Sequence, residues 1–343
     1  MGAAVASWSG ASSLVRRTAA RLQAAGRVGF YGASSKAMWK SALPWTQLEE
    51  ETRDLDLRDA YDLHVRVLQR KGMRHVLRAV EKEDLATLPF FAAFIPLDLL
   101  RVARKRRGGL TDLPVSPPDT FPYPSYYLHD FHHQANGNLS LRAALTYEWQ
   151  IRFLFLGTNR LMRQGVVDEI PPGDHLRILD VACGTASWFT QARLQGRHHR
   201  MLGVDLSPHY LRVARLFRGK HAEFQRMAAE ALDPGWTGRF DVVTCIWMFH
   251  EMPQDARDRA TEEMVRVLKP GGKLVFMDAV QPADVPHVNM RGVGEHFEDF
   301  FAEPYFEDYL RMDLPTHFAR HGLQLRNTTV WYRSKVMALY KAQ

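Results

Sequence analysis

Short apolar runs alternate with amphipathic segments over the second half of the chain. The runs predict strands near 177–182, 200–205, 223–227, 240–246, 272–279, 323–331 and 334–341. Segments with helical spacing lie near 187–195, 208–219, 254–268 and 305–321. Strands that alternate with helices form a mostly parallel sheet covered on both faces. Only Tyr332 and Arg333 separate the last two runs, which therefore predict an antiparallel hairpin.

The first half of the chain has a different pattern. Mixed charges and apolar residues at helical spacing between 48 and 82 predict one or two surface helices. Residues 108–124 contain five prolines and predict a linker. Apolar positions between 139 and 163 then predict one long helix. The chain thus divides into a basic segment (1–48), a helical region (49–113), a linker, lid and helix (114–165), and the sheet domain (166–343).

Residues 1–48 contain no acidic residue and six Lys or Arg residues. Two interpretations fit this composition: an organellar transit peptide, or a basic arm that lies on the surface. The second predicts a cytoplasmic protein, and the first predicts a mitochondrial or plastid one.

Residues 88–107 combine a short apolar piece, broken by Pro96, with a basic cluster that begins at Arg101. Such a piece suits peripheral contact with the headgroup region of a bilayer. The favoured alternative is an apolar loop packed on the core, followed by a solvated basic tail. No apolar run approaches the roughly 20 residues of a membrane-spanning helix.

Composition narrows the function classes. The chain is 46% hydrophobic and 24% charged, which suits a packed core. Cys183 and Cys245 end predicted buried strands, so they indicate a reducing compartment and no disulfide scaffold. No Cys-x-x-Cys spacing occurs, and no metal site is predicted.

The net charge of +7 lies in the first part of the chain, because residues 1–110 carry 19 Lys or Arg against 11 Asp or Glu. The remainder carries 26 against 27. An enzyme acting on nucleic acid would carry its basic surface around the catalytic cleft. A nucleic-acid partner is therefore not expected.

Two motifs point to a nucleotide-type ligand. Ile178-Leu-Asp-Val-Ala-Cys-Gly-Thr-Ala186 ends an apolar run in small residues, and Gly203-Val-Asp-Leu-Ser207 ends the next run in an acid. Small residues let the backbone approach a ligand, and Asp205 can accept hydrogen bonds from two ribose hydroxyls. A dinucleotide loop needs three glycines, but only Gly184 is present and bulky Trp188 follows. The loop suits a compact ligand without a pyrophosphate.

These motifs resemble the class I S-adenosylmethionine-dependent methyltransferases. Further matches follow in the family's order, at Met227–Leu232, Phe240–Ile246 and Arg266–Val275, where Lys269-Pro-Gly-Gly272 leads into a strand. The resemblance covers roughly 147–342, and the helix before the first motif is loosely similar to ubiquinone/menaquinone-type methyltransferases. It implies a Rossmann-like, doubly wound, seven-stranded, mostly parallel sheet with an antiparallel edge hairpin. It also implies S-adenosylmethionine as cofactor and a small, apolar or aromatic acceptor.

The resemblance assigns the cofactor site by position. Asp180 orients the loop, meets the amino group of the methionine moiety, or only caps the next helix. Asp205 accepts from the ribose, and Leu206 covers the adenine. The remaining expected cofactor residues are Ala182, Cys183, Gly184, Ala186, Ala229, Glu230, Ile246 and Trp247.

The sequence gives less information about the residues that contact the acceptor. A base is needed only when the nucleophile carries a proton of high pKa, and the candidates are His250, His132 and His133. His250 could equally cap the helix that starts near Gln254. Residues 126–138 are expected to form a lid over the acceptor. The expected acceptor contacts are Tyr126, Tyr127, His129, Asn136, Arg291, His296 and Tyr305.

The acceptor atom (carbon, oxygen or sulfur) and the oligomeric state stay open. Two other function classes are an NAD(P)-type oxidoreductase and a non-catalytic cofactor-binding scaffold.

Overall fold

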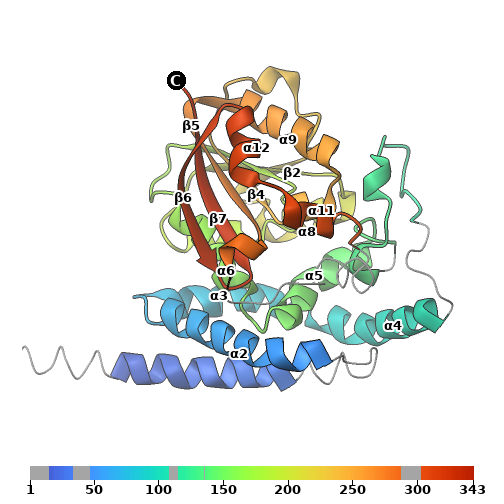
Figure 1. The fold of residues 1–343 in the computed structure, drawn as a ribbon, viewed down its shortest axis with the longest axis vertical. Helices are drawn as coiled ribbons and strands as arrows, with labels where there is room; N and C mark the ends of the chain where they lie inside the picture. Colours follow the sequence, from blue (N-terminus) through green and yellow to red (C-terminus); the bar gives the residue numbers. More distant parts are fainter. Residues whose placement is uncertain (1–14, 34–46, 108–114, 135, 287–302) are drawn as a thin grey trace, which may run out of the picture.

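The centre of the protein is one seven-stranded sheet in the order β3-β2-β1-β4-β5-β7-β6 (Figure 1). The computed structural model describes residues 15–33, 47–107, 115–134, 136–286 and 303–343. The strands are β1 (Arg177–Val181), β2 (Arg200–Asp205), β3 (Ala222–Arg226), β4 (Phe240–Ile246), β5 (Leu268–Ala279), β6 (Leu323–Trp331) and β7 (Ser334–Lys341). Neighbours among β1 to β5 pair in parallel, and β7 pairs antiparallel with β5 and β6. The predicted doubly wound sheet with an edge hairpin is confirmed.

The strand order decides where a ligand can bind. β1 lies between β2 and β4, with Asp180 opposite Gly203 on one side and Thr244 on the other. Because these three strands are parallel, their carboxyl ends lie at one edge of the sheet. The loops that follow β1 and β2 then meet there, at the switch point where the strand order reverses.

Two hydrophobic cores cover the two faces of the sheet. Neighbouring strand residues alternate between them, as Ile178 and Leu179 do. One core includes α6 (Asn159–Asp168), α7 (Ser187–Arg193) and α8 (Pro208–Arg218). The other includes α9 (Gln254–Val267), α11 (Phe306–Arg311) and α12 (Leu314–Arg320).

The N-terminal helices form a further layer on the α6–α8 side (Figure 1). They are a helix at 15–33, α2 (Gln47–Leu68), α3 (Met73–Leu85), α4 (Leu88–Arg107) and α5 (Leu141–Leu154). Leu63, Val67 and Val76 are buried in the same core as Ile178. The prediction of surface helices between 48 and 82 is thus wrong in one respect, because their apolar stripe packs against the sheet domain.

Two predicted helices are each divided in the structure. The helix expected at 139–163 is interrupted between α5 and α6, where Leu156 and Gly157 adopt φ angles of 50° and 77°. A Cβ atom on Gly157 would lie 2.5 Å from the ring of Tyr31, so glycine permits both the turn and this close approach. The helix expected at 305–321 is interrupted at Asp313, whose carboxylate accepts the N–H of Thr316 at the start of α12.

Residues 88–107 form one helix, α4, and Pro96 does not break it. The expected packed loop is therefore wrong in its secondary structure. Arg142 of α5 donates to the carbonyl of Phe94 at 2.8 Å and pairs with Asp98 at 2.6 Å, which holds the helix on both sides of the proline. Among the described residues, no helix is long and apolar enough to cross a membrane.

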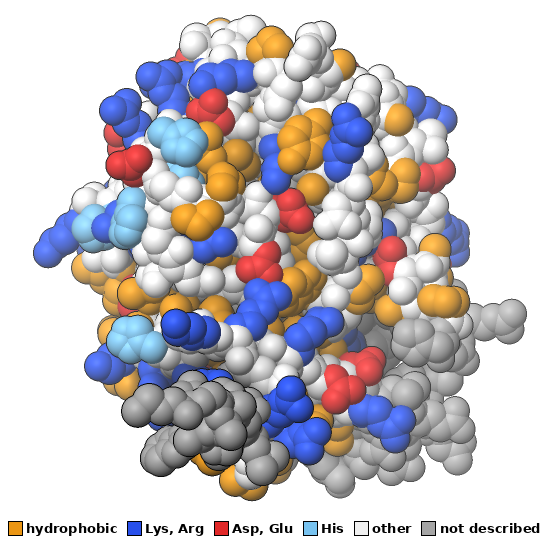
Figure 2. Space-filling model, turned by 90° about the vertical axis from the view of Figure 1, so that its left-hand side faces the viewer, with side chains coloured by type: hydrophobic (Ala, Val, Ile, Leu, Met, Phe, Trp, Pro, Cys, Tyr) orange, Lys and Arg blue, Asp and Glu red, His pale blue; other side chains and the backbone are white. Residues whose placement is uncertain are grey.

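Charges of both signs are spread over the face shown in Figure 2, among apolar side chains. The Lys and Arg side chains on this face do not form one continuous basic surface.

Candidate active site

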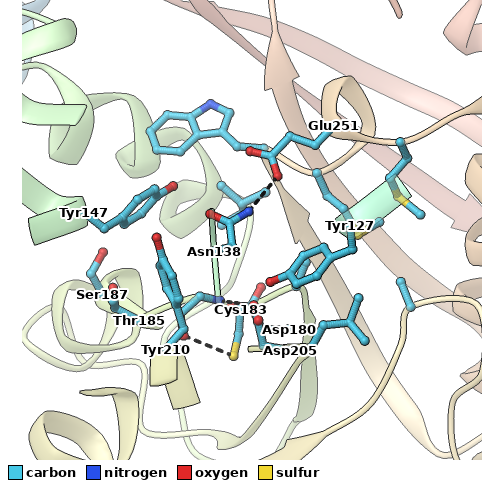
Figure 3. Close-up of a pocket in the computed structure, with 18 of the residues that line it drawn as sticks. Tyr127, Asn138, Tyr147, Asp180, Cys183, Thr185, Ser187, Asp205, Tyr210 and Glu251 are labelled. Atoms are coloured by element: carbon cyan, nitrogen blue, oxygen red, sulfur yellow. Dashed lines mark hydrogen bonds between the residues drawn. The ribbon is translucent and has the colours of Figure 1, made fainter. Parts of the chain in front are cut away.

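A cavity opens at the carboxyl ends of β1, β2 and β4 (Figure 3). It contains about 920 Å³ of empty space, its open mouth included, which falls in the usual range of about 300–1,000 Å³ for ligand sites. Nine of the expected cofactor residues line it: Asp180, Ala182, Cys183, Gly184, Asp205, Leu206, Ala229, Ile246 and Trp247.

The loop after β1 is fixed to the end of β2 by Asp205. One carboxylate oxygen accepts the N–H of Gly184 at 2.8 Å, and the other accepts the N–H of Ser207 at 2.8 Å. Each carboxylate oxygen has two lone pairs, so both can still accept a hydroxyl of a ligand. Burial raises the pKa of Asp205, and the two hydrogen bonds lower it. Burial is the larger effect, so the pKa is raised to about 6.

Asp180 is buried at the end of β1. It accepts hydrogen bonds from the indole of Trp188 at 2.9 Å and from the hydroxyl of Thr244 at 2.6 Å. Burial raises its pKa to about 7. The carboxylate therefore ties β1 to β4 and to α7, and Trp188 reaches the cavity wall with its polar atom satisfied. Helix α7 has Ala186 as its N-cap residue and no side-chain cap, so Asp180 does not cap it.

Two expected cofactor residues lie outside the cavity wall. Ala186 is buried, and its φ angle of 53° turns the loop into α7. Glu230 accepts a hydrogen bond from the Tyr126 hydroxyl at 2.7 Å. That contact commits one of its oxygens to the lid segment.

The segment expected as a lid, residues 126–138, reaches the cavity at both of its ends. It contains two short 3-10 helices, η1 (Ser125–Tyr127) and η2 (Phe131–His133). Tyr126, Tyr127 and Asn138 line the cavity. Ser207, after β2, donates to the carbonyl of Asn138 at 2.6 Å, which attaches the end of the segment to the sheet.

Three other expected acceptor contacts that the structure describes, His129, Asn136 and Tyr305, do not line the cavity. His129 and Tyr305 pack against each other, with ring centres 6.2 Å apart. Asn136 instead binds the backbone of Ser116. Its side-chain oxygen accepts the N–H of Ser116 at 2.7 Å, and its side-chain nitrogen donates to the carbonyl of Ser116 at 2.8 Å. Arg291 and His296 lie outside the described residues.

His250 lies in η4 (Phe249–Glu251), directly after β4. It does not cap α9, whose N-cap residue is Pro253. Burial favours the neutral imidazole, but Asp278, with an oxygen 2.5 Å from Nδ1, outweighs burial and raises the pKa of His250 to about 9. A pKa this far above neutral pH disfavours a general-base role for His250.

His132 contacts two acids and lies beside the cavity, but not in its wall. Its Nε2 is 3.0 Å from Glu303 and 3.7 Å from Glu251. Burial lowers the pKa of His132, while Glu303 and Glu251 raise it, and the net shift is upward. His133 is the last residue of η2, and its side chain is outside the described part of the structure.

Sequence reasoning missed half of the cavity wall. The additional lining residues are Asn138, Tyr147, Arg163, Thr185, Ser187, Trp188, Tyr210, Met227, Met248, Glu251 and Met252. Tyr147 and Arg163 come from α5 and α6, before the first motif. The sequence indicated that both residues belong to an amphipathic helix, but nothing in it indicated that they face a ligand.

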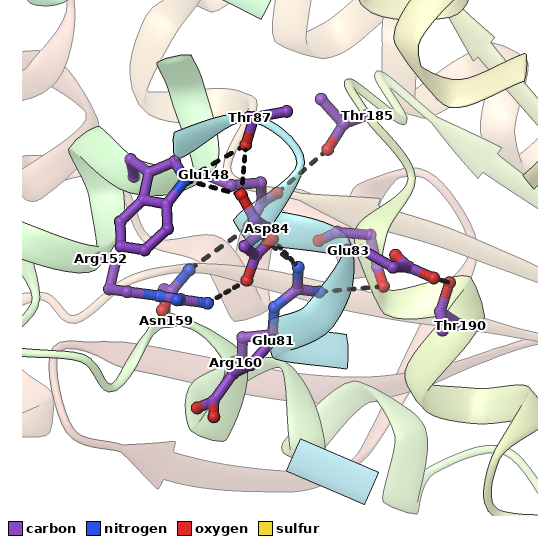
Figure 4. A network of polar contacts seen from close by, with 12 residues as sticks. Glu81, Glu83, Asp84, Thr87, Glu148, Arg152, Asn159, Arg160, Thr185 and Thr190 are labelled. Atoms are coloured by element: carbon purple, nitrogen blue, oxygen red, sulfur yellow. Dashed lines mark hydrogen bonds and ion pairs between the residues drawn. The ribbon is translucent and has the colours of Figure 1, made fainter. Parts of the chain in front are cut away.

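A buried polar network supports the loop from the side of the N-terminal helices (Figure 4). Glu148 of α5 accepts hydrogen bonds from Thr185 at 3.0 Å and from Arg163 at 2.9 Å. Asp84, at the end of α3, pairs with Arg152 and with Arg160, the latter at 2.6 Å. Both carboxylates are buried, and each has arginine partners, as buried charges require.

Comparison with known proteins agrees with this geometry. Residues 178–272 match the family model described as a methyltransferase domain. The chain is 32% identical over 152 residues to the demethylmenaquinone methyltransferase of Deinococcus radiodurans. The aligned region covers 44% of this chain and 62% of that protein. It is 35% identical over 126 residues to the ubiquinone biosynthesis O-methyltransferase of Leptothrix cholodnii, covering 36% and 52%. These matches thus span about half to three fifths of the length of those relatives.

A third relative, the demethylmenaquinone methyltransferase of Lactiplantibacillus plantarum, is 28% identical, with 52% of this chain and 78% of that protein covered.

Replacing Asp205 with Asn tests the ribose contact. We expect the affinity for S-adenosylhomocysteine to fall about ten- to a hundredfold, because hydrogen bonds to a charged acceptor contribute about 1.5–3 kcal/mol. Titration calorimetry measures the change. Unchanged affinity in a folded Asp205→Asn protein would remove Asp205 from the site.

The pH dependence of that affinity tests the same carboxylate in the wild type. Ribose hydroxyls donate to the ionised form, and the pKa of Asp205 is raised to about 6. The affinity should therefore be constant above pH 7 and should decrease below pH 6. Well below the pKa, each further pH unit should lower the affinity about tenfold. The Asp205→Asn variant should lack this dependence, and an equal decrease in both proteins would assign it to another group.

Replacing Asp84 with Ala tests the network behind the loop. Two buried arginines would lose their carboxylate, and we expect the free energy of unfolding to fall by about 3–5 kcal/mol in urea denaturation. The control is Asp168→Ala, which removes a more exposed partner of Arg70 and should cost about 0–1 kcal/mol. Equal effects of the two substitutions would mean that the buried network is not a main source of stability.

Proposed function

We propose that this chain, whose sheet domain is a class I S-adenosylmethionine-dependent methyltransferase domain, methylates a small aromatic acceptor of quinol or phenol type. The observation that carries the proposal is a cavity wall that combines the loop at Gly184 and the Asp205 carboxylate with aromatic surface. Five aromatic side chains line the cavity: Tyr126, Tyr127, Tyr147, Tyr210 and Trp247. The names of the relatives above, which refer to quinones, support the acceptor class.

The residues present fit S-adenosylmethionine, which when bound supplies an electrophilic methyl group on a sulfonium. Asp205 would accept the ribose hydroxyls. Leu206 and Ala229 would contact the adenine through apolar surface. Arg163 faces the cavity from α6 and would meet the carboxylate of the methionine moiety.

The protein's own part in the reaction is alignment and exclusion of water. Holding a nucleophile in line with an electrophilic carbon removes much of the entropic barrier. The tyrosines would hold a flat ring by stacking and by hydrogen bonds of their hydroxyls. Tyr126 and Tyr127, on the lid segment, would keep water from the reacting atoms.

The arrangement at α7 argues against a dinucleotide-dependent oxidoreductase. Dinucleotide sites place a pyrophosphate at the N-terminus of the helix after β1. Here the Glu148 carboxylate already accepts the hydroxyl of Thr185, just before α7. A pyrophosphate, with two negative charges, would be repelled by Glu148 more strongly than the single carboxylate of S-adenosylmethionine, for which Arg163 is a partner.

A ligand comparison followed by an acceptor panel tests the function. S-adenosylhomocysteine should raise the melting temperature of the purified protein, and NAD or NADP should not. With S-adenosylmethionine, hydroxylated aromatic acceptors should give release of S-adenosylhomocysteine. Stabilisation by NAD would favour the oxidoreductase. Tight cofactor binding without turnover of any quinol, phenol or other small acceptor would favour the scaffold.

We also propose that α4 contacts membrane surfaces peripherally. Its buried residues include Phe91 and Asp98, while Phe90, Leu97 and Leu100 are exposed, at 42%, 51% and 55%. Arg101 and Arg104 follow on the same helix. Apolar side chains beside basic ones suit the headgroup region of an anionic bilayer.

Flotation with vesicles containing phosphatidylserine tests this contact. The protein should float at low salt and be released at high salt, because screening weakens the attraction. Leu97→Ser combined with Leu100→Ser should weaken flotation, and so should neutralising residues 104–107. Leu216→Ser on α8, where the side chain is 73% exposed, is the matched control and should have no effect. Absence of flotation at low salt would mean that α4 only packs on the protein.

A further inference from the structure

Four side chains with metal-binding atoms meet beside the cavity, and they come from three distant parts of the chain. His132 belongs to η2, His250 and Glu251 to η4, and Glu303 to the segment before α11. The ligating atoms of His132, His250 and Glu303 all lie within 4.8 Å of one another. Glu251 is 3.7 Å from Nε2 of His132 and 4.0 Å from Nε2 of His250.

We propose that this cluster binds a divalent transition-metal ion. Ligands that each lie about 2.1 Å from an ion are separated by about 3.0–3.4 Å at right or tetrahedral angles, and by about 4.2 Å when opposite. The distance of 3.0 Å between His132 and Glu303, and the two distances to Glu251, fall in this span. Small side-chain rotations would bring the set to common bonding distance.

The contact of His250 with Asp278 has the form found behind metal-binding histidines. Its Nδ1 is 2.5 Å from an oxygen of Asp278, which leaves Nε2 as the ring atom on the side of the cluster. Asp278 is fully buried and is itself held by the N–H of Phe249 at 2.9 Å and of Ala279 at 2.7 Å. The imidazole is thus oriented before any ion binds.

Glu303 gives independent support. Its side chain is 3% exposed, and its Oε2 has no hydrogen-bond partner among the residues that the structure describes. A buried carboxylate oxygen without a partner is costly. A bound cation would satisfy it, while Oε1 is already 3.0 Å from His132.

The ligand types favour zinc or a similar ion over magnesium or calcium. Imidazole suits zinc, iron, nickel and copper, whereas magnesium and calcium prefer sites made of oxygen alone. The sequence predicted no metal site, because such predictions need ligands at short, regular spacing. Here the ligands extend from residue 132 to residue 303, and only the fold brings them together.

The position of the cluster gives the ion a role at the acceptor end of the cavity. Glu251 belongs both to the cluster and to the cavity wall, and it accepts from Asn138 at 3.4 Å. This role rests on the proposed function: an ion that binds the acceptor's hydroxyl oxygen lowers its pKa. The hydroxyl proton passes to water, the oxygen forms the bond to the methyl carbon, and the carbon–sulfur bond breaks to leave neutral S-adenosylhomocysteine.

Metal binding to the full-length protein tests the site. The wild type, freed of metal by a chelator, should bind one Zn²⁺ in this cluster by calorimetry, and Co²⁺ should give the visible absorption bands of a protein-bound ion. His132→Ala, Glu303→Gln and His250→Gln should each weaken zinc binding at least tenfold. Asp278→Asn should weaken it about ten- to a hundredfold. Magnesium should not compete.

Control variants separate the cluster from other histidines. His129→Ala, three residues before His132, should bind zinc as the wild type does. His321→Ala removes a member of the second group of metal-binding side chains, Asp258, His317 and His321, and should also leave the cluster's zinc in place. Affinity for S-adenosylhomocysteine checks that each variant is folded, and His132→Ala is the mildest because that side chain is 21% exposed.

Two results would overturn the site. One is that the wild type binds no zinc, and the other is that His321→Ala abolishes zinc binding while the variants of the cluster keep it. Metal binding is read without turnover, so the two proposals fail separately. Zinc bound in the cluster of a protein that methylates no acceptor would contradict the proposed function alone. Methylation by a protein that binds no zinc would contradict the metal site alone.

Discussion

The buried pairing of Asp84 and Glu148 with arginines is the interaction on which the rest of the site depends. Asp84 lies at the end of α3, while its partners Arg152 and Arg160 lie on α5 and α6. Glu148 in turn holds Arg163 and Thr185, both of which line the cavity. Because a buried charge cannot be left without a partner, these contacts fix the N-terminal helices against the sheet. The helices before residue 166 are therefore part of the binding site's construction.

This pairing also influences which cofactor the loop accepts. A helix N-terminus attracts anions, and in dinucleotide sites the ligand provides them. Here Glu148 provides a carboxylate from within the protein, next to Thr185. Asp205 also lines the cavity, and as an acceptor it suits hydroxyl donors. A cofactor with a ribose and a positive charge, without phosphate, matches both features.

The sheet could be predicted from the sequence because its signals are local. Strands β1, β2 and β4 are short apolar runs, and the turns after β1 and β2 carry their own small residues and acid, so Gly184 and Asp205 were identifiable. The divisions of predicted helices could not be foreseen in the same way. Gly157 turns the chain because the Tyr31 ring, 126 residues earlier, lies against it. Likewise, α4 continues through Pro96 because Arg142 holds it from another helix. Asp278 lies 28 residues after His250, and Glu303 lies 171 residues after His132. No local pattern reveals these contacts, which is why a helix cap and a base were the natural hypotheses.

The two ends of the cavity are thus built in different ways. The cofactor end consists of turns within the segment 178–272, and this segment is what the methyltransferase family model matches. The aromatic surface proposed for the acceptor comes from both parts of the chain. Tyr126, Tyr127 and Tyr147 belong to the lid and α5, outside that segment, and Tyr210 and Trp247 lie within it. Substitutions at Tyr126 or Tyr147 can change this aromatic surface without moving Asp205 or Gly184, because no strand pairing depends on them. The cofactor loops are therefore encoded locally, while the aromatic surface depends on contacts between distant parts of the chain.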